Sequence, residues 1–325
     1  MTLAPPTIAD IDACYRQPFL DLLFQAQEVH RAHHPRNVIQ LATLSNIKSG
    51  NCGEDCGYCS QSARYDTGVA ISGLPSEEEI REQARAAKSR GSSRFCMGAA
   101  WRTPPTRDFP KVLALVRAVA DEGMEACVTL GMLNAEQARA LKDAGLTAYN
   151  HNIDTAPSHY ANVVTTRTMA DRIETLGHVG DAGLQICCGG ILGLGESVEQ
   201  RIEFIETLCH LPHPPESVPI NCLTPIAGTP LADQPPVDPI DLVRTVATTR
   251  IFLPGCKVRL SAGRAQLSDE AQALCFLAGA NSIFAGEALL TTPNVEADQD
   301  ARLLEKLGLQ PAQPAGHQQT PVSAR

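Results

Sequence analysis

The sequence lacks an apolar run of about 18 residues, the shortest that spans a membrane as a helix. Its start, residues 1–6, also lacks a basic segment leading into an apolar core. We therefore expect neither a membrane span nor a secretory signal. Basic residues are fewer than acidic ones: the chain has 27 Lys and Arg and 36 Asp and Glu, which gives a formal charge of −9. Since nucleic-acid-binding proteins usually carry a basic face, this balance argues against a nucleic-acid partner.

The chain has enough length, apolar content and cysteine to narrow its class. Its 325 residues allow one large domain or two small ones, at roughly 100–200 residues per domain. With 43% hydrophobic and 19% charged residues it can bury a core, which excludes wholesale disorder. Twelve cysteines without a secretory signal indicate a reducing cytoplasm. There, thiols are more often metal ligands, catalytic groups or core residues than disulfides.

Short apolar segments alternate with longer amphipathic ones across residues 37–309, which predicts strands alternating with helices. Capping boxes mark two helix starts, where Ser76 precedes Glu79 and Ser197 precedes Gln200 by three residues. Eight strands in this pattern fit an α/β protein of the TIM type, a parallel (β/α)8 barrel, with a doubly wound open sheet as the alternative. The predicted strands are 38–44, 94–97, 126–130, 147–152, 184–188, 217–221, 257–261 and 282–284. The predicted helices begin near Ser76, Asp108, Asn134, Thr168, Ser197, Asp238 and Ser268.

Two terminal segments flank this barrel. Residues 1–36 have apolar positions at helical spacing and form a predicted N-terminal helical extension. Residues 310–325 are rich in Pro, Gln, Ala and Ser, which predicts a disordered tail. No long polar linker interrupts the alternation, so residues 37–309 are expected to be one domain.

The sharpest local feature is a C-x3-C-x2-C triplet formed by Cys52, Cys56 and Cys59 in a glycine-containing loop after the first predicted strand. Three thiolates this close, in a flexible loop, are typical of a metal cluster, and in a barrel the loop opens onto the face where active sites lie. A structural zinc site is the alternative. Zinc prefers four ligands, commonly two C-x2-C pairs, and here neither a second pair nor a nearby histidine completes the set.

Four further residues recur at the repeat length of a (β/α)8 barrel, about 31 residues per unit. Cys96 and Cys127 are one unit apart, Cys187 follows two units later, and Arg259 follows after two more and a small insertion. All four fall in predicted strands, so they can converge inside the barrel. Buried cysteines are common in strands, which is the alternative explanation. An arginine inside a barrel is costly to bury and needs an anionic partner.

Polar residues also gather in the fourth predicted strand. Asn150, Asn152 and Asp154 are spaced two apart, so on a strand they share one face and would need something to bind; a hydrated strand end is the alternative. The glycine run at residues 189–196 has Val198 where a dinucleotide-binding fingerprint has its third glycine, and it lacks the Gly-Lys-Ser/Thr of a P-loop. A tight turn before the helix capped by Ser197 is therefore expected.

The triplet, with the aromatic Tyr58 before its last cysteine, resembles the signature of the radical S-adenosylmethionine family. Residues 149–154, 258–264 and 291–294 are similar to the biotin synthases of that family in particular. The resemblance covers roughly residues 37–300. It implies a [4Fe–4S] cluster on the triplet, with an open iron that binds S-adenosylmethionine. It also implies a [2Fe–2S] cluster on Cys96, Cys127, Cys187 and Arg259 as the sulfur donor for converting dethiobiotin to biotin.

The resemblance also implies roles for individual residues. Those expected to contact S-adenosylmethionine are Tyr58, Asn152 and Asp154 (the last two at the ribose), Arg172 (near the methionyl carboxylate), and Gly189 and Gly190 (against the adenine). Those expected to contact dethiobiotin are Asn150 and Asn221 (ureido ring) and Thr291 and Thr292 (carboxylate tail). A flavodoxin- or ferredoxin-type electron donor and a homodimer are expected as well.

Two other functions would use only part of this pattern. A related radical enzyme without sulfur insertion would not need the second set of ligands. A non-catalytic iron–sulfur carrier would not need the polar strand. The remaining cysteines are expected in the core or at the surface; they are Cys14, Cys188, Cys209, Cys222, Cys256 and Cys275. Because strand side chains alternate, only one of Cys187 and Cys188 can face the barrel interior, and the resemblance selects Cys187.

Overall fold

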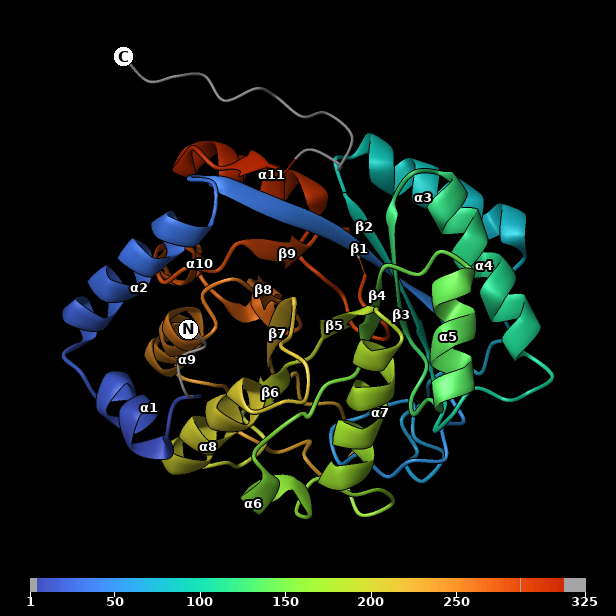
Figure 1. Ribbon diagram of the computed structural model, residues 1–325, viewed down its shortest axis with the longest axis horizontal. Coiled ribbons are helices and arrows are strands. Elements are labelled where there is room, and N and C mark those ends of the chain that lie inside the picture. Colours follow the sequence, from blue (N-terminus) through green and yellow to red (C-terminus); the bar gives the residue numbers. More distant parts are fainter. Residues whose placement is uncertain (1–4, 287, 313–325) are drawn as a thin grey trace.

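The computed structural model describes residues 5–286 and 288–312, which form a closed barrel of parallel strands surrounded by helices (Figure 1). Eight strands follow one another around the barrel in the order β1-β2-β3-β4-β5-β7-β8-β9, and β9 pairs with β1 to close the ring. The (β/α)8 prediction is thus confirmed, and the open-sheet alternative is wrong. Among the described residues, no helix is long and apolar enough to cross a membrane.

The strands lie where the apolar segments predict them. Their bounds are β1 Val38–Lys48, β2 Arg94–Ala99, β3 Glu125–Thr129, β4 Ala148–Asn150, β5 Gln185–Cys187, β6 Gly190–Leu192, β7 Ser217–Cys222, β8 Lys257–Leu260, β9 Ser282–Phe284 and β10 Gln310–Pro311. Two of these were not expected. The glycine run includes β6, which pairs with β7, where we predicted only a turn. β10 pairs with β1 at Val38 and Ile39, so the predicted disordered tail is wrong at Gln310 and Pro311. Residues 313–325 lie outside the described residues.

The helices begin where their capping residues predict. Their bounds are α1 Ile8–Tyr15, α2 Phe19–His33, α3 Glu77–Ser89, α4 Phe109–Asp121, α5 Ala135–Asp143, α6 Pro157–Tyr160, α7 Met169–Asp181, α8 Val198–Cys209, α9 Pro239–Phe252, α10 Asp269–Leu277 and α11 Ala297–Leu307, with a 3-10 turn η1 at Arg264–Gln266. All seven predicted starts are N-cap residues, and the capping boxes at Ser76 and Ser197 are both formed. The helical extension is divided in two at Pro18, and these helices pack on α8 and α9.

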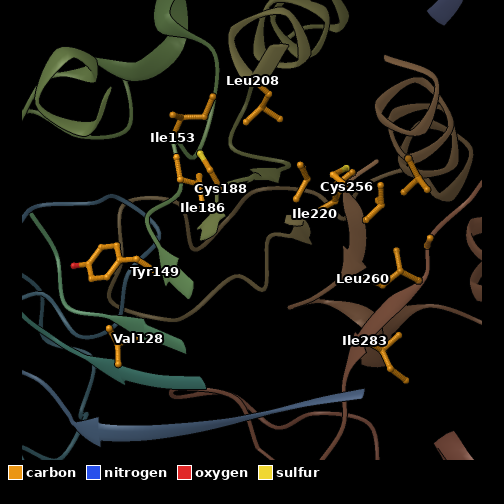
Figure 2. Packing of buried hydrophobic residues seen from close by; sticks show 14 of the residues in the cluster. Val128, Tyr149, Ile153, Ile186, Cys188, Leu208, Ile220, Cys256, Leu260 and Ile283 are labelled. Atoms are coloured by element: carbon orange, nitrogen blue, oxygen red, sulfur yellow. The ribbon is translucent and has the colours of Figure 1, made fainter. Parts of the chain in front are cut away.

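The core is a layer of apolar side chains between the strands and the outer helices. Figure 2 shows part of it, where Cys188 lies beside Ile153 and Ile186. A smaller set, formed by Ala42, Cys96, Cys127 and Ala148, lies on the other face of the strands, inside the barrel. This alternation leaves a space in the barrel interior that small side chains and thiols line. It is the space in which the candidate site is found.

Candidate functional site

One cavity of 320 Å³ extends from the loops at the carboxyl ends of the strands into the barrel interior. The loop cysteines line it at Cys52, Cys56 and Cys59, and strand residues line it at Cys96, Cys127, Cys187 and Arg259. The other predicted site residues that line it are Tyr58, Asn150, Asn152, Asp154, Arg172, Asn221, Thr291 and Thr292. Gly189 and Gly190 are the two predicted site residues outside this lining. Both predicted constellations therefore face a single space.

The cysteine loop continues directly from β1 and is held by residues far along the chain. Gly50 adopts a left-handed conformation (φ 67°) that turns the chain out of the strand. Within the loop, Cys52 pairs with Ser62 through its backbone. The Gly57 amide donates to the carbonyl of Val163 (2.8 Å), and the Leu231 amide donates to the carbonyl of Gly57 (3.2 Å). The loop is thus fixed from two sides rather than left free.

Burial makes the three loop thiols poor acids in the free protein. It raises the pKa of Cys52 and Cys56, and burial together with Cys56 raises the pKa of Cys59 to about 12. Nη2 of Arg167 lies 3.6 Å from the Cys56 sulfur, and its buried Nε has no hydrogen-bond partner among the described residues. A buried cation with a free donor beside three thiols suits a negatively charged thiolate cluster.

The loop does not have the geometry of a single-ion site. Throughout the part of the chain that the structure describes, no three His, Cys, Asp or Glu side chains are close enough to hold one metal ion. Zinc would need four such ligands in a tetrahedral arrangement. The described side chains therefore offer no site for a single zinc ion.

The strand cysteines converge because their strands are neighbours in the barrel. Cys96 and Cys127 are register partners on β2 and β3, and Cys187 pairs with Asn150 on one side and Ser217 on the other. Cys187 receives hydrogen bonds from Ser217 Oγ (3.0 Å) and Asn150 Nδ2 (3.3 Å). The hydrogen bond from Cys127, with the nearby cations, lowers the pKa of Cys96 to about 7.

Arg259 completes this group as a buried cation to which no described residue offers a carboxylate partner. Its guanidinium lies over the Phe284 ring, and its Nε and Nη2 donate to neutral oxygens of Ser282 and Gln40. Nη1 points to the Cys187 sulfur at 3.8 Å. None of the ion pairs formed by the described residues includes Arg259, which is 1% exposed. A group of anionic character among the three thiols would supply the missing charge.

Asp154 is the centre of a second polar group, near the cavity mouth. It has a left-handed backbone (φ 66°), and its carboxylate accepts hydrogen bonds from Tyr58 Oη (2.8 Å) and from Arg172. Arg172 also donates to the Asn152 carbonyl and to Tyr160 Oη. Burial alone would lower the pKa of Arg172, but the Asp154 carboxylate raises it. All three nitrogens of Arg172 are therefore engaged within the protein.

Four other predicted contact residues also have protein partners. Asn150 donates to Asn152, and its carbonyl oxygen accepts from Thr129. Asn221 donates to the Gly190 carbonyl and accepts from the Ala262 amide, so it ties β6 to the loop after β8. Thr291 forms a hydrogen bond with Ser60 (2.8 Å), which joins its loop to the cysteine loop. The glycine run is a packing feature, since a Cβ on Gly189 would lie 1.9 Å from the Pro219 carbonyl oxygen.

Sequence reasoning missed several polar residues around the site. Arg94, Gln40 and Ser217 surround the strand cysteines, and Arg167 adjoins the loop cysteines. Arg94 could have been predicted to lie near the cysteines, because it precedes Cys96 by two residues and therefore lies on the same strand face. Arg167 could not, since its loop approaches Cys56 only through the tertiary fold.

Comparison with known families matches both halves of the barrel. The Radical SAM superfamily matches residues 46–208. The Biotin and Thiamin Synthesis associated domain matches residues 219–310. The first match contains the cysteine loop and Cys96, Cys127 and Cys187, and the second contains Arg259.

Close relatives span almost the whole chain. A biotin synthase of Gloeobacter violaceus is 60% identical over 311 residues, which are 94% of this chain and 97% of that protein. A biotin synthase of Leptothrix cholodnii is 58% identical over 302 residues, 93% of this chain and 88% of that protein. Another, from Legionella pneumophila, is 55% identical over 303 residues, covering 93% and 96%.

Solved structures share the fold at low sequence identity. The crystal structure of methylornithine synthase superposes with a TM-score of 0.80 at 18% identity, covering 95% of both chains. The FeFe-hydrogenase maturase of Carboxydothermus hydrogenoformans superposes with a TM-score of 0.81 at 18% identity, covering 95% of this chain and 76% of that one. At such identity the likeness shows the common barrel only.

Proposed function

The chain belongs to the biotin synthase family of radical S-adenosylmethionine enzymes, and from this premise we propose which of its residues insert sulfur into dethiobiotin. The observation that carries the proposal is the single cavity shared by the loop cysteines and by the strand cysteines with Arg259. A radical enzyme without sulfur insertion would need only the first set. The second set, with its unpaired buried cation, supports the sulfur-donor role.

Membership of the radical S-adenosylmethionine family implies a [4Fe–4S] cluster and S-adenosylmethionine. We assign Cys52, Cys56 and Cys59 as the cluster ligands and Cys96, Cys127, Cys187 and Arg259 as ligands of a [2Fe–2S] cluster. When bound, these groups supply a carbon-centred radical and the sulfur atom. The buried cation of each set, Arg167 for the loop cysteines and Arg259 for the strand cysteines, offsets the negative charge of thiolates.

The remaining residues bind, orient and exclude water. Tyr58 and Arg172 hold one carboxylate oxygen of Asp154. We assign its other oxygen, with Asn152, to the ribose. We assign Arg172 to the methionyl carboxylate. Its hydrogen bonds to Tyr160, Asn152 and Asp154 fix the position of its guanidinium. The remaining assignments are Gly189 and Gly190 against the adenine, Asn150 and Asn221 at the ureido ring, and Thr291 and Thr292 at the carboxylate tail. A fixed arrangement of reactants in an enclosed cavity is the protein's main contribution to such a reaction.

The partners follow from the same membership. We propose dethiobiotin as substrate, a flavodoxin- or ferredoxin-type protein as electron donor, and a homodimer as the assembly. All twelve cysteines are free, which supports a reducing compartment, the cytoplasm.

The test compares two adjacent cysteines. Cys187 lines the cavity, whereas Cys188 lies in the apolar layer outside the barrel (Figure 2). Cys187→Ala should remove the two-iron centre and biotin formation, yet leave 5′-deoxyadenosine production under dithionite. Cys188→Ala should keep both clusters and turnover. Iron and sulfide content, Mössbauer spectra and a biotin assay on anaerobic protein provide the measurement.

Cys56→Ala tests the other set. It should abolish 5′-deoxyadenosine formation, because one ligand of the four-iron cluster is lost. Normal production by Cys56→Ala would overturn the loop assignment. A two-iron centre that survives Cys187→Ala but not Cys188→Ala would overturn the strand assignment.

A further inference from the structure

The Arg259 guanidinium is held so that one nitrogen faces the thiols. Its Nε donates to Ser282 Oγ (2.9 Å) and its Nη2 donates to Gln40 Oε1 (3.1 Å). Both bonds point away from the cavity cysteines. Nη1 is left facing Cys187, at 3.8 Å from the sulfur. A planar guanidinium that is held at two of its three nitrogens has a fixed orientation, so the direction in which the third nitrogen faces is fixed as well.

The Gln40 side chain is itself fixed from both ends of its amide. Its Oε1 accepts from Arg259 and from Ser282 Oγ (3.1 Å), and its Nε2 donates to Glu125 Oε2 (3.3 Å). An amide flip would place donors against Arg259 and an oxygen against the Glu125 carboxylate. Both contacts would then be repulsive, so only one orientation satisfies the neighbours. Gln40 is 4% exposed, so water does not supply an alternative.

Gln40 connects Arg259 to a polar layer one step deeper in the barrel, which we call the ionic floor. Its members are Arg94, Glu125, Gln185, Glu216 and Lys257. Four of them lie two positions before the strand cysteines and Arg259; they are Arg94, Glu125, Gln185 and Lys257. Because strand side chains alternate, each of these four lies on the same strand face as the residue two positions later, one layer deeper in the barrel. Within the floor, Arg94 donates to Glu125 (2.8 Å), Glu216 (3.0 Å) and Gln185 (3.1 Å). The floor is therefore rigid and internally charge-paired.

We propose that Gln40 is a positioning residue for the sulfur-donor site, which anchors Arg259 to the ionic floor and makes Nη1 the nitrogen presented to Cys96, Cys127 and Cys187. The inference rests on the proposed function, because it assumes that Arg259 is a ligand there. A neutral carboxamide suits this role. It holds the guanidinium without neutralising it, whereas a carboxylate at this position would pair with Arg259 and would also face Glu125.

The test uses two substitutions at Gln40 and one matched control. Gln40→Met keeps the volume but removes the acceptor, and should weaken retention of the two-iron centre about 10-fold, the lower range for partners of metal ligands. Gln40→Glu restores an acceptor, so it should retain the centre better than Gln40→Met but shift its reduction potential downward by adding negative charge. Gln272→Met makes the same change beside Arg264, a buried arginine outside both the ionic floor and the cavity, and should leave both occupancy and potential unchanged.

The measurements are iron and sulfide content, the visible and electron paramagnetic resonance spectra, and the reduction potential of anaerobic protein. Formation of 5′-deoxyadenosine shows that each variant is folded and loaded at the loop cysteines. A Gln40→Met protein with unchanged occupancy, spectrum and potential overturns the inference, and so does equal loss in Gln272→Met. The proposed function fails separately, if Cys187→Ala leaves the two-iron signals of the wild type intact.

Discussion

The buried arginines differ in the groups that balance their charge and accept their hydrogen bonds. Arg94, Arg250, Arg259 and Arg264 are among the largest fully buried side chains. Arg94 and Arg264 have carboxylate partners, at Glu125 and Glu216 and at Asp300. Arg250 has no carboxylate partner in the described part of the chain, but it makes six hydrogen bonds to carbonyl, amide and imidazole acceptors.

Arg259 has neither solution. It makes two hydrogen bonds to oxygen and one long contact to sulfur, and it alone of the four lines the cavity. Leaving buried donors unsatisfied costs about 1–3 kcal/mol each, more for a charged group. A buried cation that is left incomplete on the cavity side is expected where a ligand completes it. Burial by itself therefore does not identify the functional arginine, whereas its place on the cavity and its lack of a carboxylate partner among the described residues do.

At the same scale, Tyr160 supports the group around Asp154. Tyr160→Phe removes the oxygen that accepts from Arg172 Nε at 2.7 Å and adds nothing in its place. The buried donor is left unpaired, so the free energy of unfolding should fall by about 1–3 kcal/mol. Binding of S-adenosylmethionine should weaken, because Arg172 holds Asp154. Urea unfolding and equilibrium binding to reconstituted protein measure the two effects.

Tyr15→Phe is the control for this change. Tyr15 is equally buried, but its hydroxyl makes only long contacts, at 3.4 and 3.5 Å, to Thr245 and Asp241 where α1 packs on α9. It should lose less stability than Tyr160→Phe and bind S-adenosylmethionine normally. Equal binding by wild type and Tyr160→Phe would contradict a positioning role for Arg172.

At the scale of elements, the glycine run sets how closely β5 and β7 approach. A Cβ on Gly189 would lie 1.9 Å from the Pro219 carbonyl oxygen, and backbone cannot yield as a flexible side chain can. Gly189→Ala should therefore force the two strands apart and lower the thermal midpoint by several degrees, at about 1–3 kcal/mol for overpacking. Calorimetry of the purified variant measures it.

Gly177→Ala is the matched control, since Gly177 lies inside α7 and its added Cβ would meet nothing within 4 Å beyond its chain neighbours and its own helix backbone. The change should raise stability by up to about 1 kcal/mol, because alanine favours helix over glycine. A Gly189→Ala protein as stable as the wild type would show that position 189 accepts a side chain and that the glycine is not needed for strand packing.

Helix starts could be predicted from the sequence because their physics is local. Ser76, Asn134, Thr168 and Ser197 each accept from the amide three residues on, within one turn of chain. The short strands β6 and β10 could not be predicted, since β6 lies within the glycine run and β10 begins a stretch rich in Pro, Gln, Ala and Ser, and neither has the apolar pattern of a strand. Their conformation depends on a partner, β7 or β1, that lies far away in the sequence.

The candidate site divides in the same way. Strand period and repeat length predicted one space shared by Cys96, Cys127, Arg259 and one of two adjacent cysteines, and the family resemblance selected Cys187. The hydrogen bonds that decide their chemistry could not be predicted, because Gln40 meets Arg259 across the seam where β1 closes against β9. Arg94 and Glu216 likewise pair across the barrel. Such contacts form only when the barrel closes, and no local sequence pattern predicts which side chains then meet.

At the scale of the whole molecule, two histidines make stability depend on pH. Burial and Arg250 lower the pKa of both His30 and His34 from the ordinary 6.5 to about 4. Between these values the unfolded chain binds protons that the folded chain excludes. Stability is therefore complete above pH 6.5 and is lost as the pH falls toward 4, by at most about 3 kcal/mol per histidine.

His30→Leu should flatten this dependence, because it removes one of the two groups without leaving a buried polar atom. His33→Gln, on the exposed side of α2, should retain the wild-type slope. Unfolding free energies at pH 7.5 and 5.5 provide the comparison. An unchanged slope in His30→Leu would place the acid sensitivity elsewhere.

The anchoring of the cysteine loop also bears on how the protein is made. Cys52, Cys56 and Cys59 leave the ribosome early, but the groups that hold their loop come later, at Val163, Thr165, Thr166 and Leu231. The strand that bears the loop is seated only when β9 closes the barrel against it. A growing chain thus exposes three thiols for most of its synthesis, without a formed seat for iron. We therefore expect iron to enter the folded barrel rather than the growing chain, because the groups that hold the cysteine loop are made after it.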